Sequence, residues 1–290
     1  FVIGGGQAGF AIASKLRKLG DKRAITIISN ERYLPYQRPP LSKKYLLGGK
    51  EESQLFFRPQ SWYDKNDIKL KLGVAVEAIN KKEKSIRLRS GERYLYKNLA
   101  LTTGSRARAL PEKIGGLLKG VYSISTLNDV DVIKNEFIAG RTVLVIGGGY
   151  IGLELSSVWR RLGSNITVVE YLDHIVPGMD KDISSDFLKI LKKQGINFKL
   201  GTKVTEVRSL NNKAIVDCTN NVNKTRDRIE CDKVLVAVGR KPNHGDDIIK
   251  MGIELDDNKK IKVNSKFETS IKNIFAIGDV IDKGPMLAHK

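Results

Sequence analysis

The residues in this sequence whose spacing most directly implies chemistry are glycines in two copies of the pattern G-x-G-x-x-G. In chain order they are Gly4, Gly6 and Gly9, then Gly147, Gly149 and Gly152. The first glycine permits a tight turn, the second lets a pyrophosphate approach the backbone, and the third lets a helix pack closely on a strand. The anion lies at the helix N-terminus, where free N–H groups and the helix dipole stabilise negative charge. Two motifs therefore predict two dinucleotide-binding sites.

The segments around each motif have patterns that predict strand, turn, helix and strand. Apolar residues precede each motif, and apolar residues at three-to-four spacing follow it until Gly20 or Gly163, where a helix should end. Strands rich in β-branched residues are expected at 24–28 and 166–169. One such motif can occur by chance in a turn, but two in this context indicate two Rossmann-like domains.

Further short strands predict a β-meander attached to each half of the chain. They are expected at 85–89, 94–96 and 99–102, and at 204–207, 214–218 and 233–238. We expect an α/β fold in which the second domain, 115–241, is inserted in the first, 1–114 and 242–290. A length of 290 residues with 41% hydrophobic content fits two domains with real cores.

Composition excludes several classes of protein. Two cysteines, Cys218 and Cys231, are too few for a disulfide scaffold, and no metal-ligand spacing surrounds them. No apolar run is long enough to span a membrane, and the first residues lack the basic flank of a signal peptide. We therefore expect a cytoplasmic protein that binds neither metal nor membrane. The chain begins with Phe1 and stops directly after the dense motif 284–290, so we expect a fragment.

Five segments, together with the two glycine motifs, resemble the FAD/NAD(P)-dependent pyridine nucleotide-disulfide oxidoreductases. Residues 269–279 resemble that superfamily in general, and 36–46 resemble its ferredoxin and rubredoxin reductases. From about residue 147 onward, at 150–163, 175–180 and 284–290, the chain resembles dihydrolipoamide dehydrogenase. The resemblance implies an FAD-binding domain, an inserted NAD-binding domain, and a C-terminal interface domain that this chain lacks.

The resemblance also separates two mechanisms. Disulfide reductases of the family carry a Cys-x-x-x-x-Cys pair after the first Rossmann unit, whereas residues 29–60 here contain no cysteine. This excludes dihydrolipoamide chemistry by that route. The segment Arg38-Pro-Pro-Leu-Ser-Lys43 stands in place of the pair and points to one-electron acceptors or oxygen.

By resemblance, FAD takes the first site. The residues expected there are Gly4, Gly6, Ala8, Gly9, Asn30, Glu31, Arg38, Lys43, Val76, Asp279, Met286, Leu287, Ala288 and His289. Asn30 stands where the family has a ribose-binding acid, and Glu31 is the next candidate unless it is a solvated loop carboxylate. Asp279 would accept a ribityl hydroxyl, or cap a helix. Ser125 stands where ferredoxin reductases usually have Arg.

The second site is expected to bind the nicotinamide nucleotide. Its residues are Gly147, Gly149, Tyr150, Ile151, Gly152, Glu154, Glu170, Val204 and Gly239. Glu170 ends the second strand of this unit, a spacing that suits a carboxylate binding both ribose hydroxyls. It would repel a 2′-phosphate, so we expect NADH to be preferred over NADPH.

Lys43 and Glu154 are the predicted catalytic residues. We expect Glu154 in the first turn of its helix, paired with a Lys43 that stabilises negative charge on the reduced flavin. The pair should be partly desolvated where the nicotinamide stacks. Alternatively, Glu154 is an exposed side chain that interacts with the helix dipole.

The implied activity is hydride transfer from NADH to FAD, followed by electron transfer to an acidic, ferredoxin-type iron–sulfur protein. The net charge of +19 would steer such a partner, although scattered lysines can also be plain solvated surface. Two alternatives stay open: a dihydrolipoamide-dehydrogenase-like flavoprotein with diaphorase activity only, and a nucleic-acid-binding flavoprotein like apoptosis-inducing factor. The basic segment 81–97 supports the latter, but its alternation fits a hairpin better, which disfavours nucleic acid. A homodimer is expected only for the full-length protein.

Overall fold

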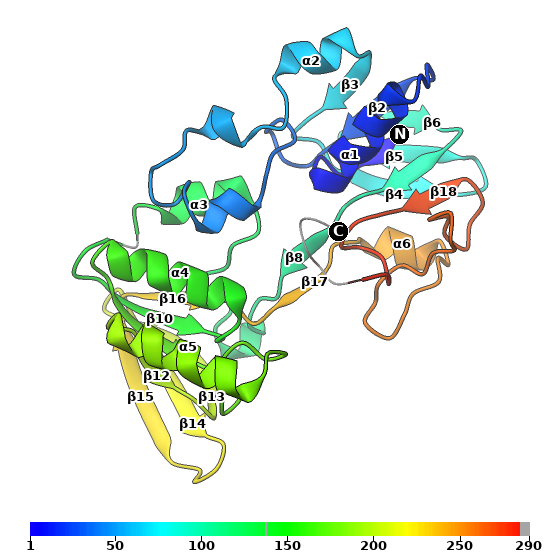
Figure 1. Cartoon of the computed structure of the whole chain (residues 1–290). Coiled ribbons are helices and arrows are strands. Elements are labelled where there is room, and N and C mark those ends of the chain that lie inside the picture. Colours follow the sequence, from blue (N-terminus) through cyan, green and yellow to red (C-terminus); the bar gives the residue numbers. More distant parts are fainter. Residues whose placement is uncertain (137, 285–290) are drawn as a thin grey trace. The chain divides into compact units, whose positions relative to one another are not determined.

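The contacts of the chain divide it into two compact units. The computed structural model describes residues 1–136 and 138–284 (Figure 1). Unit 1 comprises Phe1–Arg38, Glu51–Arg106 and Arg240–Lys290, and unit 2 comprises Pro39–Lys50 and Ala107–Gly239. The domain boundaries expected from the sequence stay a prediction. The contact division differs from them in assigning residues 39–50 and 107–114 to unit 2 and residues 240–241 to unit 1.

Unit 1 is built on a parallel five-stranded sheet with the strand order β18-β7-β1-β2-β3. Its strands are β1 (Val2–Ile3), β2 (Ile25–Ile28), β3 (Ile68–Lys71), β7 (Leu99–Leu101) and β18 (Ile274–Ala276). These strands are almost continuously apolar because a parallel sheet is covered on both faces. An antiparallel meander accompanies the sheet, formed by β4 (Val76–Asn80), β5 (Ser85–Leu88) and β6 (Arg93–Leu95).

Helix α1 (Gln7–Lys18) joins β1 to β2 and begins directly after Gly6. It buries Ala13 completely, and Phe10 stacks on Phe57 with ring centroids 4.7 Å apart. The helix ends before Gly20, whose φ of +80° closes the chain in the left-handed region. The short helices of unit 1 are α2 (Gln60–Lys65), α6 (Asp246–Lys250) and the 3-10 turn η2 (Glu52–Leu55).

Unit 2 repeats this plan with the parallel strand order β12-β11-β10-β16-β9. Its strands are β9 (Val121–Tyr122), β10 (Thr142–Ile146), β11 (Asn165–Val169), β12 (Asn197–Lys199) and β16 (Lys233–Val236). Helices α3 (Leu127–Ile133), α4 (Tyr150–Arg161) and α5 (Lys181–Lys193) belong to it, with the 3-10 turns η1 (Pro39–Ser42) and η3 (Glu112–Ile114). Its meander is β13 (Thr202–Leu210), β14 (Lys213–Asn220) and β15 (Arg226–Cys231).

The predicted fold class is confirmed: two parallel α/β sheets are present, each with a glycine motif, and the strands of the second lie in the chain between β7 and β18 of the first. The predicted composition of the meanders was wrong, because the segments expected at 99–102 and 233–238 form β7 and β16 of the parallel sheets, and β4 and β15 complete the meanders instead. The largest difference in length is β13, which runs from Thr202 to Leu210 instead of 204–207. Its last three residues are exposed and extend a hairpin ribbon beyond the core, so they carry little apolar signal. Strands β8 (Ser105–Ala107) and β17 (Arg240–Pro242) form a separate pair. Among the described residues, no helix has the length and apolarity needed to cross a membrane.

Candidate functional site

The glycine loop of unit 1 has the close contacts that its motif implies. A Cβ on Gly4, whose φ is +119°, would lie 2.4 Å from the Thr102 carbonyl oxygen, and a Cβ on Gly9 would lie 2.0 Å from the Gly4 oxygen. A Cβ on Gly6 would meet nothing within 4 Å. Two glycines are therefore required by the protein's own backbone. The middle glycine, Gly6, instead leaves open space at the N-terminus of α1, as a bound phosphate requires.

Thr102 holds this loop in place, a role that was not predicted from the sequence. Its hydroxyl lies 3.0 Å from the carbonyl oxygen of Ile3 and 2.9 Å from that of Gly4, and it is 3% exposed. A threonine one residue after a buried strand, in Leu101-Thr-Thr-Gly, was the available signal.

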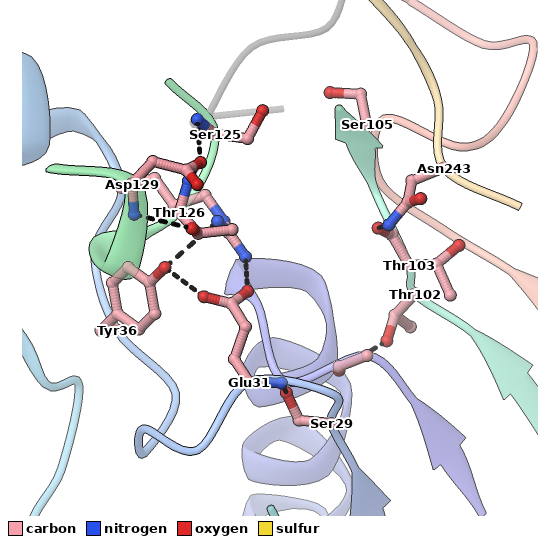
Figure 2. A network of polar contacts seen from close by, with 12 residues as sticks. Ser29, Glu31, Tyr36, Thr102, Thr103, Ser105, Ser125, Thr126, Asp129 and Asn243 are labelled. Atoms are coloured by element: carbon pink, nitrogen blue, oxygen red, sulfur yellow. Dashed lines mark hydrogen bonds and ion pairs between the residues drawn. The ribbon is translucent and has the colours of Figure 1, made fainter. Parts of the chain in front are cut away.

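The end of β2 places the two candidate ribose ligands differently. Asn30 is exposed, whereas the Glu31 carboxylate accepts a hydrogen bond of 2.5 Å from the Tyr36 hydroxyl (Figure 2). Arg38 also donates to Glu31 and forms an ion pair with it. Glu31 is thus an ordered carboxylate rather than a freely solvated one. Arg38 and Glu31, both expected at the FAD site, lie together.

Asp279 belongs to a polar chain that includes a half-buried arginine. Its carboxylate accepts a 2.7 Å hydrogen bond from Ser105, whose hydroxyl accepts one of 2.8 Å from Arg240 Nε. Burial lowers the pKa of Arg240, and the negative charge of Asp279 opposes that shift. Neither Ser105 nor Arg240 was predicted. A half-buried guanidinium beside this carboxylate suits a pyrophosphate, because it supplies charge and a planar set of donors.

The remaining FAD candidates are less informative. Val76 lies in β4 opposite Leu88 and packs, half-buried, against the core of unit 1. Ala8 is in the first turn of α1. Asp279 lies in a turn that is followed by a β-bridge at Ile281 and bends at 282–284, so no helix begins at Asp279 within the described part of the chain. Four further candidates lie outside the described residues: Met286, Leu287, Ala288 and His289.

The glycine loop of unit 2 follows the same plan. A Cβ on Gly147, whose φ is +111°, would lie 2.4 Å from the Ala237 oxygen, and one on Gly152 would lie 2.2 Å from the Gly147 oxygen. Gly149 again faces open space. Both loops therefore leave room for a ligand at the middle glycine.

Glu170 is 8% exposed and binds the loop itself. One carboxylate oxygen accepts a 2.6 Å hydrogen bond from the Gly148 N–H, and the other accepts one of 2.9 Å from Leu172. The Val176 N–H donates to the Gly148 oxygen at 2.8 Å. Val176 has a φ of +46°, an unfavourable value for a β-branched residue. The loop is thus held from both sides, and each carboxylate oxygen retains a lone pair for a ribose hydroxyl.

The other nucleotide candidates differ in what they can offer. Tyr150 and Ile151 begin α4, and Tyr150 is 57% exposed. Gly239 is exposed with a φ of +96°. Val204 packs its side chain into the core of unit 2, so only its backbone can face a ligand.

Lys43 and Glu154 form the ion pair that the sequence predicts, with Nζ and Oε2 2.8 Å apart. The Ser42 hydroxyl donates to the same carboxylate oxygen at 2.9 Å. One expectation was wrong. Glu154 is the fifth residue of α4 and lies in its second turn, because the helix begins at Tyr150. The Lys43 and Glu154 side chains are 51% and 39% exposed, so their attraction is that of a surface pair, about 0–1 kcal/mol.

The other polar predictions have clear positions. Ser125, which stands where related reductases have Arg, accepts a hydrogen bond of 2.8 Å from the Ala107 N–H. Cys218 and Cys231 are free and buried. Burial raises the thiol pKa of Cys218 to about 11 and that of Cys231 to about 12. Neither thiol suits a redox relay, since the thiolate is the reactive form. No cluster suited to a metal ion occurs among the described residues.

Comparisons with known proteins agree with this geometry. The family described as pyridine nucleotide-disulphide oxidoreductase matches residues 1–290. A rubredoxin-NAD(+) reductase of Pseudomonas putida is 31% identical over 281 residues, which are 96% of this chain and 70% of the relative. A dihydrolipoamide dehydrogenase of Chaetomium thermophilum is 43% identical over 199 residues, which are 67% of this chain and 37% of the relative.

Solved structures show the same similarity. The ferredoxin reductase for the CYP199A2 system of Rhodopseudomonas palustris superposes with a TM-score of 0.89 and 32% identity, over 97% of this chain and 68% of that one. Putidaredoxin reductase, in its covalent complex with putidaredoxin, superposes with a TM-score of 0.88 and 29% identity, over 97% of this chain and 67% of that one. This chain thus spans about two thirds of the length of each reductase.

Proposed function

The chain belongs to the pyridine nucleotide-disulphide oxidoreductase family, and on that premise we propose that it passes electrons from NADH through FAD to a ferredoxin-type iron–sulfur protein. Family membership makes it an FAD- and NAD(H)-dependent oxidoreductase, as expected from the sequence. The finer assignments, to a particular acceptor and to particular residues, are the proposal.

FAD, when bound, accepts a hydride and releases electrons one at a time; the protein's task is to hold and tune it. In unit 1, the open side of Gly6 would receive the pyrophosphate at the N-terminus of α1. Asp279 would accept a ribityl hydroxyl, and its Ser105 contact fixes its orientation. The half-buried Arg240 would neutralise phosphate charge.

In unit 2, Gly149 and Glu170 would bind different parts of the nucleotide. The open side of Gly149 would receive the pyrophosphate of NADH. Glu170, held in place by Gly148 and Leu172, would accept hydrogen bonds from the adenosine ribose. A buried carboxylate at that point repels a 2′-phosphate, which favours NADH over NADPH. The relative's name, rubredoxin-NAD(+) reductase, agrees with this preference.

The observation that carries the proposal is the Lys43–Glu154 pair. Its lysine lies in the segment where disulfide reductases carry two cysteines, and residues 29–60 of this chain contain none. A lysine there can stabilise negative charge near the flavin but cannot form a mixed disulfide. The acceptor should therefore take electrons without a thiol relay. The relatives named rubredoxin-NAD(+) reductase and rhodocoxin reductase support an iron–sulfur protein, and a net charge of +19 supports an acidic one.

The second candidate is a dihydrolipoamide-dehydrogenase relative with diaphorase activity only, favoured by the 43% identity to such an enzyme over 199 residues. The two candidate functions can be distinguished by mixing the NADH-reduced holoenzyme with an acidic [2Fe–2S] ferredoxin and, in parallel assays, with oxidised lipoamide and with a dye. We expect ferredoxin reduction and no lipoamide turnover. Dye reduction alone, with no transfer to any ferredoxin, would favour the diaphorase.

The FAD site itself is tested by Asp279→Ala, with the exposed Asp257→Ala as the matched control. Removing the carboxylate should sharply lower FAD occupancy, because it deletes an acceptor and leaves its donors unpaired. The ratio of flavin to protein absorbance measures this. If Asp279→Ala purifies as yellow as Asp257→Ala, FAD does not use this residue.

A further inference from the structure

The segment Pro39–Lys50 packs with unit 2, although the chain on both sides of it belongs to unit 1. Within unit 2 it is attached at two places. Ser42 and Lys43 bind Glu154 of α4, and Tyr45 binds Asp131 of α3. The first attachment is part of the proposed function. The second has no role in it.

The Tyr45–Asp131 contact has the geometry of an ordered hydrogen bond. The Tyr45 hydroxyl donates to Asp131 Oδ1 at 2.7 Å, and Lys134 Nζ donates to the same oxygen at 3.0 Å. Lys134 Nζ also lies 5.8 Å from the centroid of the Tyr45 ring. The Asp131 side chain is 27% exposed, less than either member of the Lys43–Glu154 pair. The second attachment is therefore the less solvated of the two.

The backbone between the two attachments is compact, so that one attachment can restrain the other. The N–H groups of Lys43 and Tyr45 both donate to the Pro40 carbonyl oxygen at 3.0 Å, and Leu47 donates to Lys43 at 3.1 Å. Leu41 and Leu46 are buried. Fixing the Tyr45 side chain consequently limits where the Lys43 backbone can lie.

Such a restraint is needed because the Lys43–Glu154 pair is half exposed. An ion pair of that kind gains little free energy and must immobilise a long, flexible lysine side chain. We propose that Tyr45 and Asp131 are positioning residues, which hold segment 39–50 on α3 so that Lys43 stays at Glu154. This inference rests on the proposed role of Lys43 in flavin reduction.

Hydrogen exchange tests the restraint without reference to activity. Tyr45→Phe keeps the ring and removes the hydroxyl. The matched control is Tyr94→Phe, which removes a tyrosine–carboxylate hydrogen bond to Glu92 in unit 1. In the FAD-loaded protein, we expect peptides from 39–50 to exchange about three- to tenfold faster in Tyr45→Phe, as the loss of one hydrogen bond implies. Tyr94→Phe should leave them unchanged. Equal exchange of these peptides in both variants overturns the inference.

Single-turnover flavin reduction by NADH tests the consequence. Tyr45→Phe and Asp131→Asn should each slow reduction at saturating NADH about three- to tenfold, with FAD content and NADH affinity unchanged. In a Lys43→Met background, Tyr45→Phe should have no further effect, because it acts through Lys43. Additive losses would mean that Tyr45 acts elsewhere and would overturn the inference.

The same experiment separates this inference from the proposed function. If Lys43→Met reduces as fast as the parent, the proposed role of Lys43 fails and the positioning role fails with it. If Lys43→Met is slow while Tyr45→Phe matches the parent, only the positioning role is overturned. Slow reduction in both, without additivity, supports both.

Discussion

The two glycine loops share one backbone design but are fastened by different side chains. In unit 1, the Thr102 hydroxyl reaches the carbonyl oxygens of Ile3 and Gly4 from the end of β7. In unit 2 the corresponding residue is Ala237, whose oxygen likewise limits the first glycine but whose side chain has no hydroxyl. There the loop is held by Glu170 and Val176.

The ends of the second strands show the same difference. Gly4 donates to Ile28 and Gly147 donates to Val169, so the next residues, Ser29 and Glu170, occupy corresponding positions. A serine in unit 1 leaves the nearby acid, Glu31, to bind Arg38. In unit 2 one carboxylate holds the loop and, in the proposed function, also binds the ribose. We infer that nucleotide selection and loop stability are coupled in unit 2 and separate in unit 1.

The largest effects are expected from alanine at the third glycine of either loop. In Gly9→Ala or Gly152→Ala the new Cβ would lie 2.0 or 2.2 Å from a backbone oxygen, so the helix must move. We expect a loss of at least about 1–3 kcal/mol of unfolding free energy. In Gly6→Ala or Gly149→Ala the Cβ meets open space, so stability should hold while FAD or NADH binding weakens. Denaturant unfolding and nucleotide titration measure the two effects, and similar stability losses at both positions would contradict this distinction.

Glu170→Gln breaks the coupling in unit 2. It keeps the size of the side chain but weakens its contacts with Gly148, Leu172 and the ribose. NADH affinity should fall by about 1.5–3 kcal/mol, the range for a hydrogen bond to a charged group, and NADPH affinity by less. The FAD content of unit 1 should not change. Titrating the holoenzyme with each nucleotide tests this; an unaltered NADH/NADPH ratio would show that Glu170 only holds the loop.

Thr102→Ala gives the loop of unit 1 the alanine that unit 2 has at the corresponding position, Ala237. It removes one buried hydroxyl from the loop, and we expect a loss of about 0.5–1.5 kcal/mol in unfolding free energy. Thr103→Ala is the control, since the Thr103 contact with Asn243 uses the backbone carbonyl. Urea unfolding of both variants measures the difference. If Thr102→Ala is as stable as Thr103→Ala, backbone contacts alone hold this loop in place.

The smallest effect at neutral pH is expected from the thiols, which occur only in unit 2. Because burial raises the pKa values of Cys218 and Cys231 to about 11 and about 12, neither should react with a thiol reagent at pH 8 in the native protein. Both should react in denaturant. Their contribution to stability is fully present below about pH 9, where the unfolded thiols keep their protons, and is lost as the pH rises towards 11–12. Rapid labelling of native protein at pH 8 would contradict their burial.

Much of the fold could be predicted from the sequence because local patterns of residues determine it. The two glycine motifs, the apolar strands and the glycines at positions 20 and 163 act over a few residues, and each occurs where the pattern predicts. The Lys43–Glu154 pair was also expected, although only through the resemblance to known reductases. The start of α4 was not, since the helix begins at Tyr150 and moves Glu154 into the second turn.

The sequence by itself determined two dinucleotide-binding units, because a glycine's tolerance of positive φ and close approach is a property of single residues. Only the tertiary structure decided which charges and hydroxyls serve them. Ser105 meets Asp279 across 174 positions and Arg240 meets Ser105 across 135. Glu170 turns back to Gly148 across 22 positions. No periodicity encodes such pairs. The Ser105–Asp279 and Glu170–Gly148 contacts arise because parallel strands bring their carboxyl ends to one edge of a sheet, whatever their separation in the chain. The Arg240–Ser105 contact arises from the pairing of β17 with β8.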